Sequence, residues 1–291
     1  MSVKSIFTRS ELEYLINFTY MELYLDLLKK VLTDLHRIEK GEYKPLTQSG
    51  LSWKQKFLVP FDKLLRRNNY SICKHIVPSI AARSAGIDWP ASAETMIGLK
   101  RLDNIQFCIE QIVANGVKGD LIETGVWRGG AVIFMRAVLK AHHVTDRVVW
   151  AADSFEGLPK PDESRYVQDK GDTHHRYEIL NVSLDEVKYN FKKYDLLDDQ
   201  VKFIKGWFKD SLPGAPIKSL ALLRLDGDMY ESTMDALVNL YPKLSRGGYA
   251  IVDDFNTVKA CRLAVEDFRT KQGIKDEIMP IDNESIYWKK S

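Results

Sequence analysis

From residue 120 onward, short apolar runs alternate with longer stretches in which apolar residues recur at helical spacing. This alternation predicts a mostly parallel, twisted sheet with helices on both faces, in which ligands bind at the carboxyl ends of the strands. The predicted strands are 120–123, 147–152, 201–205, 220–225 and 249–252, with a final pair at 277–280 and 285–289. The predicted helices between them are 131–141, 184–194 and 232–244.

Before residue 120 the pattern is helical. Residues 10–40 predict one helix with Ser10 as its N-cap, and residues 96–114 predict another. The segment 41–60 predicts a linker, because it holds two glycines and two prolines. We therefore expect an N-terminal helical extension, residues 1–85, followed by an α/β domain, residues 86–291.

The predicted helix at 10–40 carries an apolar stripe among acidic and basic residues. We interpret this stripe as a packing or dimerisation face rather than as a membrane-surface face, because a surface helix on a membrane is mainly basic. The stripe consists of Leu12, Leu15, Ile16, Tyr20, Leu23, Tyr24 and Leu27.

The composition changes this picture little. Of 291 residues, 45% are hydrophobic and 28% are charged, and the formal net charge is +2, so neither a nucleic-acid partner nor an acidic one is expected. No apolar run is long enough for a membrane span, and the first residues lack the layout of a signal peptide. Three widely spaced cysteines fit a reducing compartment, and we expect a cytoplasmic protein.

A glycine-containing loop follows the first predicted strand, in the segment 121–130, LIETGVWRGG. An acidic residue at the strand end, a tight turn and a helix N-terminus are typical of a site where the backbone approaches a ligand. The spacing differs from the G-x-G-x-x-G of dinucleotide sites, and no Lys-Ser/Thr follows to form a phosphate loop. The loop indicates either a nucleotide-like ligand without phosphates or a turn with only a structural role.

Acidic residues follow three of the predicted strands. Asp153 comes after the second strand, where an acidic side chain can bind ribose hydroxyls or can cap a turn. Two later strands end in pairs of aspartates, at residues 226 and 228 and at residues 253 and 254. Carboxylates that meet at one edge of a sheet repel one another unless a cation neutralises them, and oxygen ligands favour Mg²⁺. A metal site is thus one interpretation, and ordinary turns are the other.

The histidines indicate less. His174 and His175 fall in a polar segment that we interpret as a solvated loop rather than as a substrate lid. No nucleophile elbow or Cys/His pair is recognisable, so the sequence does not support covalent nucleophilic catalysis.

Together these segments resemble the macrocin-type O-methyltransferases (the TylF family), which act on sugar or polyketide hydroxyls of antibiotics and related natural products. The resemblance covers about residues 90–289 and rests on 95–98, 101–104, 123–130, 153–159, 206–208, 225–233 and 247–254. It implies a class I methyltransferase with a Rossmann-like, seven-stranded sheet that depends on S-adenosylmethionine and Mg²⁺ and forms a homo-oligomer. The first ~85 residues match no motif of the family that we can transfer.

The family resemblance also implies roles for individual residues. Asp226, Asp253 and Asp254 would bind the metal, and Asp228 would be the general base. Residues 123–127 would hold the methionine part of the cofactor, Asp153 the ribose and residues 206–207 the adenine side. The complete set implied for S-adenosylmethionine is Thr95, Met96, Glu123, Thr124, Gly125, Val126, Trp127, Asp153, Ser154, Gly157, Ser183, Gly206 and Trp207.

The chemistry implied is a displacement by a hydroxyl oxygen of a small-molecule acceptor at the sulfonium methyl group. A metal lowers the pKa of such a hydroxyl, and Asp228 removes its proton. Because a neighbouring oxygen would help to chelate the metal, we expect a vicinal diol or a similar acceptor. The alternatives are a catechol- or phenol-type methyltransferase, a nicotinamide-dependent oxidoreductase and a non-catalytic cofactor-binding interaction protein. The missing G-x-G-x-x-G argues against the oxidoreductase, and the four aspartates argue against a non-catalytic protein.

Overall fold

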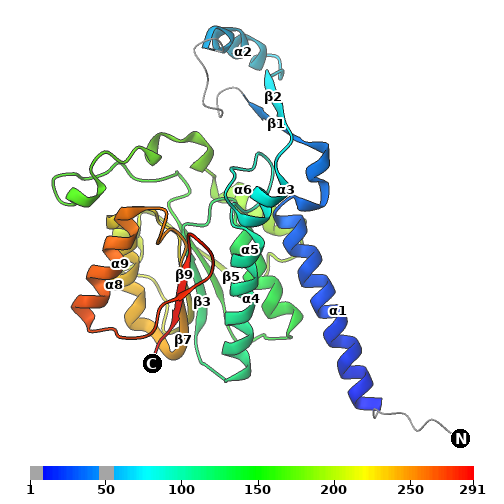
Figure 1. Ribbon diagram of the computed structural model, residues 1–291, viewed down its shortest axis with the longest axis vertical. Coiled ribbons are helices and arrows are strands. Elements are labelled where there is room, and N and C mark those ends of the chain that lie inside the picture. Colours follow the sequence, from blue (N-terminus) through cyan, green and yellow to red (C-terminus); the bar gives the residue numbers. More distant parts are fainter. Residues whose placement is uncertain (1–8, 46–55) are drawn as a thin grey trace, which may run out of the picture.

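The computed structural model describes residues 9–45 and 56–291, with side chains described from residue 19 to 45 and from residue 57 onward. A seven-stranded sheet with the order β5-β4-β3-β6-β7-β9-β8 lies between two layers of helices (Figure 1). The first five strands in this order are parallel, and β9 and β8, at the other edge, are antiparallel to their neighbours. This arrangement confirms the predicted fold class. The strands are β3 (Asp120–Thr124), β4 (Val149–Asp153), β5 (Val201–Lys205), β6 (Leu220–Leu225), β7 (Leu244–Val252), β8 (Met279–Pro280) and β9 (Ile286–Lys289).

Alternate residues of the central strands belong to different hydrophobic clusters, as expected for a sheet that is covered on both faces. Leu121 and Leu222 pack in the cluster with α4, α5 and α6, whereas Ile122 and Leu223 pack in the cluster with α8 and α9. The helices are α4 (Leu99–Ala114), α5 (Gly130–Ala141), α6 (Leu184–Lys193), α8 (Tyr230–Leu240) and α9 (Lys259–Gln272), with the short α7 (Phe208–Ser211) after β5.

The N-terminal region differs from the prediction of one helix at 10–40. α1 (Arg9–Leu32) ends before Asp34, whose φ of 59° is left-handed, and a 3-10 helix (Leu35–Lys40) follows. The predicted linker is wrong at residues 42–45, where β1 (Glu42–Pro45) pairs antiparallel with β2 (Cys73–Ile76), and at residues 56–60, which are helical. Residues 46–55 of that linker lie outside the described residues. Short helical elements complete the region: a 3-10 turn (Lys56–Leu58), α2 (Val59–Arg66) and α3 (Ile80–Ala85).

α1 extends away from the sheet, and its last turns pack on the helical layer (Figure 1). Leu25, Leu28 and Leu32 belong to the same hydrophobic cluster as α4 and α5. The described part of the predicted stripe points elsewhere, since Leu23 and Leu27 are exposed. The predicted cap and the first part of the stripe lie outside the described side chains, namely Ser10, Leu12, Leu15 and Ile16. In the part of the chain that the structure describes, no helix combines the length and apolar character needed to cross a membrane.

Several other boundaries differ from the prediction by a few residues, and the two largest shifts are next to each other. The predicted helix at 232–244 ends at Leu240, where a 3-10 turn containing Pro242 begins, because proline cannot continue the backbone hydrogen bonding of a helix. The following strand begins at Leu244 rather than at residue 249. Neither shift alters the carboxyl ends of the strands, where the candidate site lies.

Candidate active site

Two adjoining cavities lie at the carboxyl ends of the parallel strands. Counting the space open to solvent, the first has a volume of about 790 Å³ and the second about 1130 Å³. Their shared walls come from residues in the loops after β3 and β6 and from two residues outside these loops. These shared residues are Met96, Gly125, Trp127, Leu180, Asp226 and Asp228.

The glycine-containing loop after β3 is held against its neighbours. Gly125 has φ of +84°, and a Cβ atom at this position would lie 1.7 Å from the carbonyl oxygen of Asp226. Glycine is therefore required here by the approach of the β6 end to the β3 end, as well as by the left-handed backbone. Beyond it, the indole Nε1 of Trp127 donates a hydrogen bond to the carbonyl oxygen of Ile179 at 2.7 Å. The connection between β4 and α6 thus fixes the position of this loop.

Asp153, at the end of β4, lines the first cavity. Its carboxylate accepts hydrogen bonds from the backbone N–H groups of Val126 and Phe155, each at 2.7 Å. Burial raises the pKa of Asp153, and these N–H groups oppose the rise because they stabilise the charged form. Other predicted cofactor residues line the same cavity: Ser154, Gly157, Gly206 and Trp207.

Most of the remaining predicted cofactor residues line the second cavity alone or line both cavities. Thr95, Glu123 and Val126 line the second cavity, next to the shared Met96, Gly125 and Trp127. Within the described residues, Thr124 and Ser183 line neither cavity. Thr124 is buried inside β3, and the Ser183 hydroxyl caps α6 by accepting a hydrogen bond from the Glu186 N–H. The cavities therefore do not support the predicted contact of these two residues with the cofactor.

A compact acidic cluster lies just beyond the ends of β6 and β7 and consists of Asp226, Asp253 and Asp254. One carboxylate oxygen of each lies within 4.8 Å of the others. Burial raises the pKa of Asp226 and of Asp254, and the neighbouring carboxylates raise both further. Oδ2 of Asp254 is buried and has no hydrogen-bond partner among the described residues. An oxygen-rich, over-charged cluster with an unpartnered buried oxygen fits a hard divalent cation.

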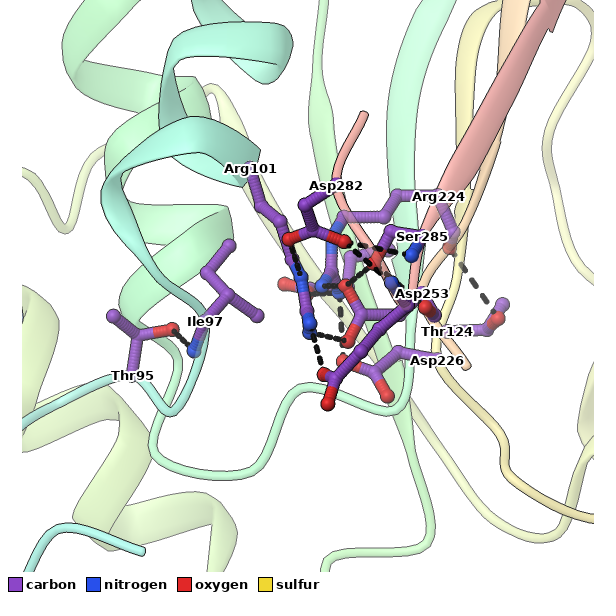
Figure 2. Close-up of polar contacts among 11 residues, drawn as sticks. Thr95, Ile97, Arg101, Thr124, Arg224, Asp226, Asp253, Asp282 and Ser285 are labelled. Carbon is purple, nitrogen blue, oxygen red and sulfur yellow. Dashed lines mark hydrogen bonds and ion pairs between the residues drawn. The ribbon is translucent and has the colours of Figure 1, made fainter. Parts of the chain in front are cut away.

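Two buried arginines contact this cluster (Figure 2). Arg224 of β6 donates to Glu123 at 2.5 Å, to Asp226 at 2.8 Å and to Asp253 at 2.5 Å. Arg101 of α4 donates to the other oxygen of Asp253 at 2.8 Å. Burial raises the pKa of Glu123 to about 8, while the charge of Arg224 opposes this rise. Arg224 and Arg101 thus place positive charge on two sides of the acidic cluster.

Asp228 stands where the two cavities meet. Its φ of 55° is left-handed, which aspartate tolerates better than most residues, and it lines both cavities. Burial and the nearby Asp226 raise the pKa of Asp228 to about 7, and His174 opposes the rise. A carboxylate in this position can accept a proton from a group that is bound in the second cavity.

Several residues of the site were not predicted to contribute. Arg224 was detectable as the one charged side chain within the otherwise apolar strand LALLRL, but nothing in the sequence indicated its partners. The interpretation of His174 as part of a solvated loop is wrong, because it lines the second cavity and its Nδ1 lies 2.7 Å from Oδ2 of Asp172. The second cavity is also lined by Ile87, Asp88 and Trp89, which follow α3.

Comparison with known proteins agrees with this geometry. The family profile described as macrocin O-methyltransferase (TylF) matches residues 21–290. Demethyldecarbamoylnovobiocin O-methyltransferase from Streptomyces niveus is 56% identical over 210 residues, which are 72% of this chain and 80% of that protein. The 8-demethyl-8-(2,3-dimethoxy-alpha-L-rhamnosyl)-tetracenomycin-C 4'-O-methyltransferase from Streptomyces olivaceus is 49% identical over 269 residues, 92% of each chain.

A solved structure extends the comparison to the fold. The O-methyltransferase NovP matches with a TM-score of 0.78 at 46% sequence identity, covering 93% of this chain and 99% of that one. The family match begins at residue 21 and so includes much of the N-terminal region in which the sequence motifs gave no correspondence. The chain therefore belongs to the macrocin O-methyltransferase (TylF) family and is an S-adenosylmethionine-dependent O-methyltransferase.

Proposed function

We propose that this enzyme is Mg²⁺-dependent and methylates a hydroxyl group on a small natural product of the antibiotic type, with a sugar hydroxyl as the first choice of acceptor. The observation that carries the proposal is the placement of Asp228 next to the cluster of Asp226, Asp253 and Asp254, at the junction of two cavities. The first cavity and the residues it shares with the second can hold the methyl donor, and the rest of the second cavity can hold the acceptor.

Asp226, Asp253 and Asp254 would hold the metal. A bound Mg²⁺ supplies positive charge that lowers the pKa of an acceptor hydroxyl and stabilises the developing alkoxide. The cluster itself supports this assignment, because its carboxylates lie close together in a buried setting and Oδ2 of Asp254 lacks a partner among the described residues.

The first cavity, between the ends of β4 and β5, is the proposed site of the adenosine part of the cofactor. Asp153 lines this cavity and can bind the ribose hydroxyls, and Trp207 can stack on the adenine. Glu123 lies in the second cavity, near the shared loop, where it can hold the ammonium group of the methionine part. S-adenosylmethionine supplies an electrophilic methyl group on sulfur.

Asp228 is the proposed general base. A sugar hydroxyl is a poor nucleophile when neutral, so its proton must leave as the oxygen reacts. Asp228 borders the second cavity and its pKa is raised to about 7, so its carboxylate has a higher proton affinity than an ordinary aspartate. The carboxylate receives the proton as the oxygen attacks the methyl group.

Two observations support a glycosidic acceptor in the second cavity. The first is the name of the relative from Streptomyces olivaceus, which specifies transfer to the 4'-oxygen of a rhamnosyl group that bears methoxy groups at positions 2 and 3. The second is the pair of rings on the wall of this cavity, Trp89 and His174, each of which packs edge-on against Tyr177. Aromatic rings of this kind suit the apolar face of a sugar or of its aglycone. We expect an oxygen next to the reacting hydroxyl, as a free hydroxyl or as an ether.

The experiment combines calorimetry with turnover. S-adenosylhomocysteine is titrated into the enzyme, and methylation is then assayed with demethyldecarbamoylnovobiocin, phenyl α-L-rhamnoside and catechol, each with Mg²⁺ and with EDTA. We expect micromolar cofactor binding and EDTA-sensitive methylation of a glycoside. The Asp228→Asn variant should bind the cofactor normally but lose about 10²–10⁴-fold in turnover. Turnover that is insensitive to EDTA would disprove the metal role, and methylation of catechol alone would replace the sugar acceptor with a phenolic one.

We further propose that the N-terminal extension, residues 1–85, contributes to a homo-oligomer and to the entrance for the acceptor. The exposed face of α1 at Leu23 and Leu27 supports the first role. The contact of Lys44, in the extension, with Trp89 supports the second, since the Lys44 ammonium donates a hydrogen bond to the backbone carbonyl of Trp89 on the wall of the second cavity. Light scattering of the purified enzyme, with and without a Leu23→Glu substitution, measures whether a subunit interface depends on this face.

A further inference from the structure

Arg224 joins the ends of three adjacent strands. It lies in β6, fully buried, and one guanidinium contacts Glu123 at the end of β3, Asp226 just beyond β6 and Asp253 just beyond β7. A buried arginine in a central strand is costly unless its charge and its hydrogen bonds are compensated. Here three carboxylates at the same edge of the sheet compensate the charge through Nη1 and Nη2, while Nε has no partner among the described residues.

Asp253 is held from both sides. Its Oδ1 accepts from Arg224 at 2.5 Å and its Oδ2 accepts from Arg101 at 2.8 Å (Figure 2). Arg101 comes from α4, 152 positions earlier in the chain, and also binds Asp282 at 2.8 Å and Glu284 in the segment before β9. The Ser285 hydroxyl donates to the backbone carbonyl of Asp253 at 2.6 Å. The carboxylate of Asp253 therefore has a fixed orientation before any cation is present.

Asp254 has no comparable support. Its carboxyl group shares a hydrogen bond with Asp226, and its Oδ2 has no partner in the described part of the chain. The two neighbouring aspartates thus differ: both oxygens of Asp253 accept hydrogen bonds from arginines, whereas Oδ2 of Asp254 has no partner among the described residues. Because an ionised carboxylate offers about four acceptor positions, Asp253 keeps free lone pairs after both arginines have bound.

We propose that Arg224 and Arg101 are positioning residues of the metal site: the two guanidinium groups orient Asp253 and let the carboxylates gather before the cation arrives. The inference rests on the proposed function in taking the aspartate cluster as a metal site. The planar guanidinium fork is essential to it, since a lysine ammonium is a single point charge and cannot hold the same set of carboxylates in fixed directions. Partners that orient metal ligands typically change metal affinity by about 10–100-fold when they are altered.

The test measures Mn²⁺ binding by electron paramagnetic resonance, because Mn²⁺ accepts the same oxygen ligands as Mg²⁺ and needs no acceptor substrate. Arg224→Lys and Arg101→Lys should each bind Mn²⁺ about 10–100-fold more weakly than the unaltered enzyme. Arg136→Lys is the matched control, since Arg136 is also buried and makes a two-pronged contact with Asp198, which is not part of the acidic cluster. It should lose stability without losing metal affinity.

Arg101→Met separates positioning from charge. If the arginine acted only through its positive charge, its removal would increase the attraction between the carboxylates and the cation, and Mn²⁺ would bind more tightly. Positioning instead requires weaker binding in both Arg101→Lys and Arg101→Met. Circular dichroism establishes that each variant is folded at the assay temperature, and Arg101→Lys serves as the main variant if Arg224→Lys does not fold.

The outcomes distinguish the positioning role of the arginines from the existence of the metal site. Unchanged Mn²⁺ affinity in Arg101→Lys, or an equal loss in Arg136→Lys, would overturn the positioning role and leave the metal site intact. Tighter binding in Arg101→Met would also overturn it. Failure of the unaltered enzyme to bind Mn²⁺ at millimolar concentration would remove the metal from the proposed function and this inference with it.

Discussion

The backbone N–H of Val126 donates to Oδ2 of Asp153 at 2.7 Å and so ties the loop after β3 to the end of β4. The other oxygen of the same carboxylate accepts from the N–H of Phe155, again at 2.7 Å. One side chain therefore sets the shape of two loops that border the first cavity. This relationship adds a structural role to the ribose contact that the family resemblance implies for Asp153.

Replacement of Asp153 with asparagine should weaken S-adenosylhomocysteine binding by about tenfold or more. An amide can accept with only one of its two terminal atoms, so one backbone N–H would face an NH₂ group, and a loss of about 1.4 kcal/mol is already tenfold. Calorimetry measures the change. Asp162→Asn is a suitable control, because Asp162 is an exposed carboxylate that caps a turn in the same connection. Equal binding by Asp153→Asn and the unaltered enzyme would contradict both roles.

Gly125→Ala should destabilise the protein much more than an alanine at an open glycine with a similar backbone. The new Cβ would lie 1.7 Å from the Asp226 carbonyl oxygen, and the left-handed backbone adds its own strain, so we expect a loss of about 3 kcal/mol. Gly116 has φ of +62° with nothing within 4 Å of the built Cβ, so Gly116→Ala isolates the backbone effect, about 1 kcal/mol. Urea unfolding of both variants compares the two losses. Similar losses in the free energy of unfolding would show that the ends of β3 and β6 can move apart at little energetic cost.

The sheet and its acidic edge could be predicted because their signals are local. Each central strand is a short apolar run, and Asp226, Asp253 and Asp254 directly follow such runs. Parallel strands then bring those ends together, so the cluster follows from topology. α9 was missed by the sequence analysis, although Cys261, Ala264, Val265 and Phe268 are buried at helical spacing, because small side chains make this stripe indistinct.

Other features depend on partners that are distant in the sequence. Glu123 lies 101 positions before Arg224. The partner of this charged residue inside β6 is therefore known only once β3 and β6 are seen to pair. The break after α1 has a similar origin. Asp34 takes a left-handed backbone while its carboxylate accepts from Arg37 and from Ser92, which is 58 positions away. Nothing in the local pattern of residues 10–40 indicates that stop.

The ion pair between Arg136 and Asp198 should make stability depend on pH in a defined direction. Two hydrogen bonds, from Nε at 3.0 Å and from Nη2 at 2.6 Å, join α5 to the loop after α6. The hydrogen bond from Arg136 lowers the pKa of Asp198 below its ordinary value. The stabilisation is therefore complete above the unfolded pKa of about 3.9 and is lost as the pH falls through the folded pKa.

Asp198→Asn should accordingly lower the free energy of unfolding by about 1 kcal/mol at pH 7 and by much less near pH 3. We keep the estimate this small because the Asp198 side chain is 37% exposed and solvent screens the pair. Urea unfolding of the variant and the unaltered enzyme across this range gives the difference directly. A difference that stayed constant with pH would mean that the pair contributes packing rather than charge.

Trp89→Ala should raise the KM for the acceptor by about tenfold and leave S-adenosylhomocysteine affinity unchanged. Trp89 lines the second cavity but not the first, and its ring meets Tyr177 edge-on at 5.7 Å between centroids. Loss of an aromatic contact with the sugar or its aglycone costs about 0.5–1.5 kcal/mol beyond the area that it buries, which is enough for this change.

Tyr189→Ala provides the control, because Tyr189 is an exposed aromatic residue outside both cavities. Steady-state kinetics with whichever glycoside the enzyme methylates measures KM, and calorimetry measures cofactor binding. A loss of cofactor affinity in Trp89→Ala, with KM for the acceptor unchanged, would mean that the two cavities have been assigned to the wrong ligands.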